Sequence, residues 1–116
     1  MEKKSHNNKL MNQIMDTIHN RYADSSFSLS YLSEQHSMNP SYLSSFFKEQ
    51  TGTNFIDHLT RYRLQAAKIL LSDTQLSIEV ISQKVGYLSG NGFRQAFSKH
   101  EGISPMQYRK LHTKQN

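Results

Sequence analysis

The chain has 116 residues, which is enough for one domain or for two very small subdomains. Its 14 Lys and Arg residues outnumber its nine Asp and Glu residues, and the formal net charge of +5 suits a polyanionic partner, although a solvated basic surface explains the charge equally well. Because there is no cysteine, no charged-then-apolar leader and no apolar run of about 20 residues, the sequence excludes a disulfide framework and a thiolate metal site, and we expect a soluble cytoplasmic protein.

The first predicted element is a helix over residues 8–23. Its apolar residues fall on one helical stripe, formed by Met11, Ile14, Met15, Ile18 and Tyr22. We expect this stripe to pack in a core, with an interaction surface as the alternative. The polar residues 1–7 before it are expected to form a flexible N-terminus.

Two helices are predicted next, with a short turn between them. Ser28 is a good N-cap for a helix over 29–36, and Asn39-Pro40 reads as an N-cap followed by proline at the first helical position. The second of these helices should run to about Thr51 and bury Leu43, Phe46 and Phe47. Its outward or edge residues are Ser41, Tyr42, Ser44, Ser45 and Lys48.

A long helix should follow over residues 54–72, because Gly52 ends the preceding helix and Asn54 is a suitable cap. Its apolar positions continue for about four turns, or about 25 Å at ~1.5 Å per residue. Arg63 in this helix has two candidate roles. It contacts a phosphate of the polyanionic partner or, as we favour, it hydrogen-bonds to structural groups.

A second helix–turn–helix pattern occupies residues 73–111. Ser77 caps a helix over 78–84, and Gly86 lies where a left-handed backbone is needed. A helix starting at Ser89 or Gly90 should turn Phe93, Ala96 and Phe97 inward. Its opposite face carries Asn91, Arg94, Gln95, Ser98 and Lys99. A last short helix, 105–111, and a loose tail, 112–116, complete the chain.

The two patterns are copies of each other. Ile78, Ile81 and Ser82 lie 49 residues after Leu29, Leu32 and Ser33. Beyond the turn the offset becomes 50, and it relates Phe93, Phe97 and Gly102 to Leu43, Phe47 and Gly52. The apolar and turn positions recur while the outward residues differ, as expected when one scaffold reads two different surfaces.

A helix-turn-helix places its second helix in the DNA major groove, which gives the outward residues a role. Arg94 can donate two hydrogen bonds to guanine, whereas Asn91 and Gln95 can pair with adenine. In the first copy two interpretations remain open. Its serines and Tyr42 touch bases or phosphates, with Lys48 on a phosphate, or the short side chains only allow a close approach.

Four ordered motifs resemble the DNA-binding region of AraC-type transcription regulators. They are R-L-x-x-A-x-x-L-L from Arg63, I-x-x-I-S-x-x-V-G-Y from Ile78, F-x-x-x-F from Phe93, and G-x-S-P-x-x-Y-R from Gly102. The resemblance covers nearly the whole chain. It implies an all-α module of about seven helices, in which a long central helix joins two helix-turn-helix subdomains that bind specific double-stranded DNA.

The resemblance also implies partners that the chain itself does not reveal. Regulators of this type contact RNA polymerase and usually carry a sensing or receiver domain, so we expect this chain to be a C-terminal piece of a longer protein, with a small stand-alone regulator as the alternative. Gly90, Gly92, Ser98 and His58 depart from the family pattern. The glycines allow close backbone approach or leave the helix partly disordered until DNA binds, and one phosphate contact is in doubt.

The residues argue against two other classes of function. The sequence has no H-x-x-x-H spacing, Gly-rich phosphate loop or G-x-S-x-G turn, so we expect neither catalysis nor a cofactor or metal. A helical protein–protein interaction module without DNA binding would explain the helices, but it would not explain the paired motifs or the basic excess.

Overall fold

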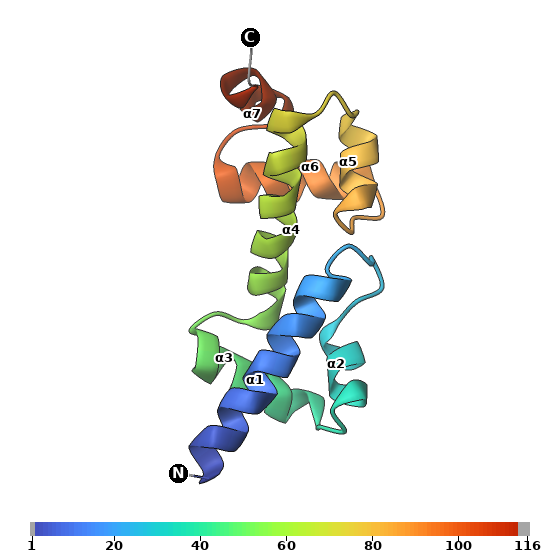
Figure 1. Ribbon diagram of the computed structural model, residues 1–116. Helices are drawn as coiled ribbons and strands as arrows, with labels where there is room; N and C mark the ends of the chain where they lie inside the picture. Colours follow the sequence, from blue (N-terminus) through green and yellow to red (C-terminus); the bar gives the residue numbers. More distant parts are fainter. Residues whose placement is uncertain (1, 114–116) are drawn as a thin grey trace. The chain divides into compact units, whose positions relative to one another are not determined.

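The computed structural model describes residues 2–113, and within this range the chain forms seven α-helices and no strand (Figure 1). The helices are α1 (Glu2–Arg21), α2 (Leu29–Gln35), α3 (Pro40–Thr51), α4 (Phe55–Asp73), α5 (Ile78–Lys84), α6 (Gly90–Glu101) and α7 (Pro105–His112). The predicted all-α class is confirmed. No helix in the described part of the chain combines the length and the apolar character that crossing a bilayer requires.

Most helices begin at the cap that the sequence predicts. The Ser28 hydroxyl accepts a hydrogen bond from the Tyr31 amide at 3.2 Å, and the Ser77 hydroxyl accepts one from the Val80 amide at 3.1 Å. The Asn39 side chain accepts from two amides of the first turn of α3. These bonds satisfy amides that have no partner inside the helix, so each helix start is fixed locally.

The chain divides into two compact units. Unit 1 comprises Met1–Arg21 and Phe27–Leu59, and it contains α1, α2, α3 and the first turn of α4. Its core consists of apolar side chains from all four elements: Ile14, Ile18, Phe27, Leu32, Leu43, Phe46, Phe47, Phe55 and Leu59. Phe55 packs edge-on against both Phe27 and Phe47, with ring centroids 5.7 Å apart in each pair.

Unit 2 comprises Tyr22–Ser26 and Thr60–Asn116, and it contains the rest of α4 together with α5, α6 and α7. One side of α4 and the inner faces of α5 and α6 form its core, with Leu64, Ala67, Leu71, Ile78, Ile81, Val85, Phe93 and Phe97 buried. Phe97 also meets Tyr108 of α7 edge-on at 5.6 Å. The two phenylalanines of α6 are fully buried, so the opposite face of that helix must face outward.

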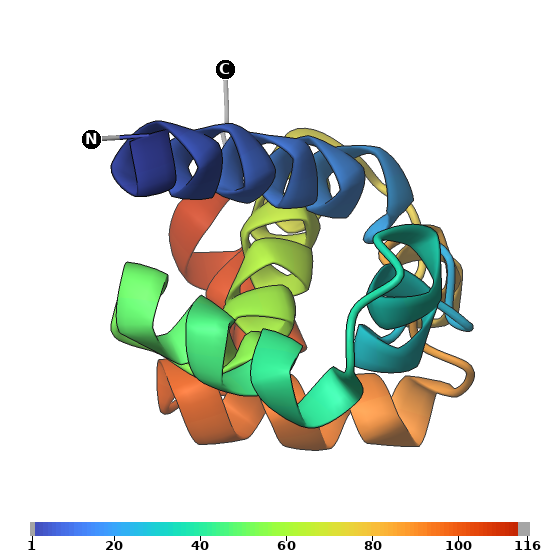
Figure 2. The ribbon, with the colours of Figure 1, turned by 90° about the horizontal axis from the view of Figure 1, so that it is seen from below.

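The turns of the two helix–turn–helix copies have the same hydrogen bonds. The Met38 amide donates to the Ser33 carbonyl at 2.9 Å, and the Tyr87 amide donates to the Ser82 carbonyl at 2.9 Å. The residue before each donor has a positive φ, 52° at Ser37 and 103° at Gly86. Figure 2 shows the connection that leads from α2 into α3. The repeat inferred from spacing is therefore present in the backbone.

Several boundaries differ from the expected ones, most of them by one or two residues. Helix α1 begins at Glu2 rather than at residue 8, because residues 2–7 contain no proline or glycine to stop a helix that is already nucleated. The segment Tyr22–Ser26 is grouped with unit 2 although it directly follows α1. Of the predicted tail, His112 ends α7 and Thr113 caps it, while residues 114–116 lie outside the described range.

Candidate nucleic-acid interface

Helix α6 presents a polar face of the kind that the sequence predicts for a recognition helix. Ser89 caps it, its side chain accepting from the Gly92 amide at 3.2 Å. Phe93 and Phe97 fix the buried side of the helix. The five candidate residues all lie exposed on the remaining surface: Asn91, Arg94, Gln95, Ser98 and Lys99. The structure thus brings together on one helix the donors that the sequence assigned to base and phosphate contacts.

Helix α3 presents a less charged surface. Among its candidate residues Ser41, Tyr42, Ser45 and Lys48 are exposed, and Ser44 is half-buried at the edge. The Tyr42 side chain keeps 61% of its surface exposed while its ring stacks on Phe46 at 6.4 Å between centroids. An aromatic ring held in this way at the first turn of a helix can contact a sugar or a base edge without losing much side-chain freedom.

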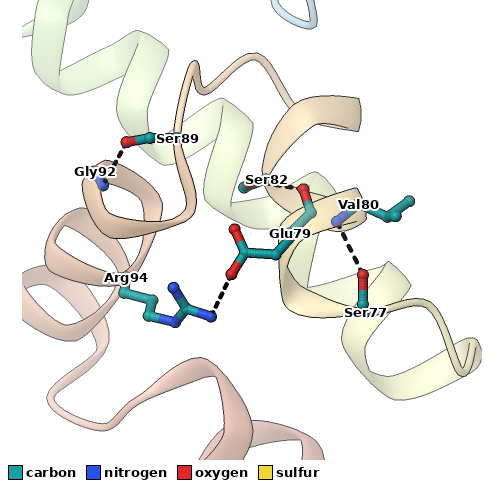
Figure 3. Close-up of polar contacts among 7 residues, drawn as sticks. All are labelled: Ser77, Glu79, Val80, Ser82, Ser89, Gly92 and Arg94. Atoms are coloured by element: carbon teal, nitrogen blue, oxygen red, sulfur yellow. Dashed lines mark hydrogen bonds and ion pairs between the residues drawn. The ribbon is translucent and has the colours of Figure 1, made fainter.

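Arg94 is paired with an acidic residue that the sequence did not predict in the interface. One of its terminal nitrogens, Nη2, lies 2.6 Å from Oε1 of Glu79 in α5. Figure 3 shows the contact between the two side chains. The side chains of Arg94 and Glu79 remain 45% and 59% exposed. An arginine has five N–H donors, so this ion pair leaves donors available for a base.

Glu79 also explains the glycine at the start of α6. A Cβ built on Gly90 would lie 2.1 Å from Glu79 Oε2, so the carboxylate occupies the space that a side chain would need. Gly90 is buried and α6 is helical from this residue onward. The sequence signal for this contact was therefore the combination of a glycine at the helix start with an acidic residue in the first turn of the helix before it.

Arg63 has the structural role that we favoured. Its Nε donates to the Tyr22 carbonyl at 2.8 Å and its Nη2 donates to the Asp24 carbonyl at 3.0 Å. Its guanidinium carbon lies 5.7 Å from the centre of the Tyr87 ring. Burial lowers the pKa of Arg63, while Tyr87 and Asp24 act in the opposite direction. The residue holds the segment after α1 within unit 2.

Arg109, the last residue of the G-x-S-P-x-x-Y-R motif, acts in the same way. Its Nε donates to the Leu71 carbonyl at 3.0 Å and its Nη2 donates to the Thr74 carbonyl at 3.3 Å. Leu71 lies in the last turn of α4 and Thr74 directly follows the helix, where the final carbonyls of a helix have no partner inside it. The motif alone predicts no role for Arg109, and in the structure this residue caps the end of α4.

Comparison with known proteins agrees with this geometry. A family model described as a helix-turn-helix domain matches residues 32–111. The arabinose operon regulatory protein of Escherichia coli (strain K12) is 32% identical over 92 residues, which are 79% of this chain and 32% of that protein. Three curated relatives are matched over only 13% to 39% of their own lengths, so the chain spans well under half of each.

Two solved structures share the fold over most of both chains. The C-terminal domain of AraT, a response regulator from Geobacillus stearothermophilus, is 33% identical with a TM-score of 0.89, covering 92% of this chain and 88% of its own. The C-terminal domain of the two-component response regulator yesN from Fusobacterium nucleatum is 39% identical with a TM-score of 0.84, and the match covers 85% of this chain and 96% of that domain.

The capped helices and the two matching turns define a helix-turn-helix protein. The family match and the relatives narrow this class, and the chain belongs to the AraC-type family of transcription regulators.

Proposed function

We propose that this chain is the part of a transcription regulator that binds specific double-stranded DNA, with α6 entering a major groove. The observation that carries the proposal is the two-sided character of α6, whose phenylalanines are buried while Asn91, Arg94 and Gln95 face outward. In this role Arg94 donates to a guanine, and Asn91 and Gln95 pair with adenine. Ser98 and Lys99 contact the phosphate backbone.

We propose further that α3 enters a second major groove on the same side of the duplex. Helix α4 has 19 residues, about 28 Å at ~1.5 Å per residue, and on DNA it would connect two readers about one helical turn, ~34 Å, apart. In α3 the contacts come from Ser41, Tyr42, Ser44 and Ser45, with Lys48 on a phosphate. The net charge of +5 supports the sequence-independent part of the affinity.

The remaining partners are proposed from the family. Two of the solved relatives are C-terminal domains of response regulators, and this supports a sensing or receiver domain elsewhere in the full protein. We propose that the complete regulator acts in the cytoplasm, that it contacts RNA polymerase, and that it is not an enzyme.

Selection of bound duplexes from a random library tests the proposal. The expected site is bipartite, with half-sites about 10 bp apart. Arg94→Ala should reduce the preference for one guanine by about 1–3 kcal/mol and leave the other positions unchanged. Weakening that is uniform across sequences would instead make Arg94 a phosphate contact, and binding that does not fall with salt would favour a protein–protein interaction module.

A further inference from the structure

The ion pair between Glu79 and Arg94 places a negative charge beside the strongest candidate for reading a base. Both side chains are about half exposed, so neither is needed to fill the core. An exposed pair of this kind contributes little to stability, typically well under 1 kcal/mol. Its presence in the candidate interface therefore calls for an explanation other than folding.

The position of the carboxylate is set by the backbone and not only by Arg94. Gly90 leaves the space that Glu79 Oε2 occupies, since a Cβ there would approach to 2.1 Å. The carboxylate thus lies against the first residue of α6, a 12-residue helix whose amino end carries a partial positive charge. Arg94, one turn further along the same helix, meets the other oxygen of the carboxylate, as the close-up in Figure 3 shows.

The first copy of the motif lacks every part of this arrangement. With the offsets of the repeat, Glu79 corresponds to Ser30, Gly90 to Pro40 and Arg94 to Ser44. The shared features, by contrast, are kept. The Ser33 and Ser82 hydroxyls each donate to the carbonyl three residues earlier, at 2.8 and 2.7 Å. The pair is therefore an addition to the second copy and is not required by the scaffold.

We infer that Glu79 is a specificity-determining positioning residue, which holds Arg94 for a guanine and keeps it from a phosphate. This inference rests on the proposed function. Without a fixed partner, a long arginine side chain beside DNA is drawn to the nearest phosphate, a contact that carries no sequence information. Glu79 holds one end of the guanidinium and offsets its charge, so the attraction to phosphates weakens while donors remain for guanine O6 and N7.

The test measures binding of Glu79→Gln by fluorescence anisotropy to three duplexes. They are the selected site, the same site with the guanine replaced, and an unrelated sequence. A good bidentate contact discriminates against the wrong base by roughly 5- to 150-fold. In Glu79→Gln the ratio of the affinities for the selected site and for the site with the guanine replaced should therefore fall at least fivefold. Affinity for the unrelated duplex should rise about two- to fivefold, and the salt dependence should steepen by about one phosphate contact.

Asp16→Asn is the matched control, because it removes an exposed carboxylate on α1, which carries no candidate DNA contact. It should leave discrimination at the guanine unchanged. Gly90→Ala is a second test, because its methyl displaces the end of a flexible side chain without removing the charge. Discrimination should fall in this variant too, while the net charge stays the same.

The outcomes separate this inference from the proposed function. If the wild-type chain prefers no duplex, both are overturned. If Arg94→Ala loses the guanine preference while folded Glu79→Gln keeps all of it, only the role of Glu79 is overturned. In the Arg94→Ala background, Glu79→Gln should cause no further loss of discrimination, and an additional loss would mean that Glu79 acts on some other contact.

Discussion

Gly86→Ala should destabilise unit 2 far more than the same change at another glycine with positive φ. Gly86 has a φ of 103°, and a Cβ there would lie 2.5 Å from the Tyr22 carbonyl oxygen and 2.7 Å from Arg63 Nε. The left-handed backbone costs an L-residue about 1–2 kcal/mol. The added methyl must also push apart the Arg63–Tyr22 hydrogen bond, a charged bond worth about 1.5–3 kcal/mol. The expected loss is therefore about 3–5 kcal/mol.

Gly102→Ala provides the matched control in the same unit. Gly102 has a φ of 79°, but a Cβ there would meet nothing within 4 Å, so only the backbone cost of about 1–2 kcal/mol applies. Urea unfolding followed by far-ultraviolet circular dichroism gives the free energies of both variants, with the slope m compared to detect separate unfolding of the two units. Equal losses at the two glycines would refute the steric role assigned to Gly86.

Three other substitutions test single features. Ser37→Gly should stabilise unit 1 by about 0.5–1 kcal/mol in urea unfolding, because Ser37 has a φ of 52°; a loss of stability would contradict this. Arg63→Lys should lower the free energy of unfolding by about 2 kcal/mol, because an ammonium cannot donate to the Tyr22 and Asp24 carbonyls with the geometry of a guanidinium. The folded variant should keep its affinity for duplex DNA, and weaker binding would indicate that Arg63 contacts a phosphate. Burial raises the pKa of Tyr87 above 10.0, so the folded state favours the neutral phenol and its free energy of unfolding should decrease as pH rises past about 10. In unfolding curves measured over a pH series, Tyr87→Phe should make this decrease smaller.

The elements of the fold follow from local signals and were predicted well. Helix α5 spans the expected 78–84, and α6 begins directly after its cap Ser89. Caps and helical periodicity act over three or four residues, so the sequence carries them directly. The start of α1 was missed for the same reason. Residues 2–7 contain no start signal, and a helix there depends on extension from a neighbour that is already packed.

The contacts of the candidate site were predictable only in part. The exposed donors of α6 follow from the burial of Phe93 and Phe97, which lie four residues apart and mark the inward side of the helix. The pairing of Arg94 with Glu79 joins two helices across a turn, and periodicity says nothing about which side chains meet there. Gly90 was interpreted as a place for close backbone approach or for partial disorder. The structure adds a role that the sequence did not predict, since Gly90 makes room for Glu79, and the approach to DNA stays a prediction.

The two copies of the motif differ in the residues that would contact DNA, so we expect them to contribute differently to sequence preference and to affinity. Both copies keep the buried serine, the positive-φ turn and the apolar side of the second helix, so selection on folding alone would account for everything they share. Of the two second helices, α6 carries an arginine that is paired with a carboxylate, whereas α3 offers hydroxyls and the ring of Tyr42. A hydroxyl can donate or accept and so distinguishes bases weakly, but a guanidinium held in one orientation matches the two acceptors of guanine. Most of the sequence preference of the proposed complex should therefore arise at α6, with α3 adding affinity and register.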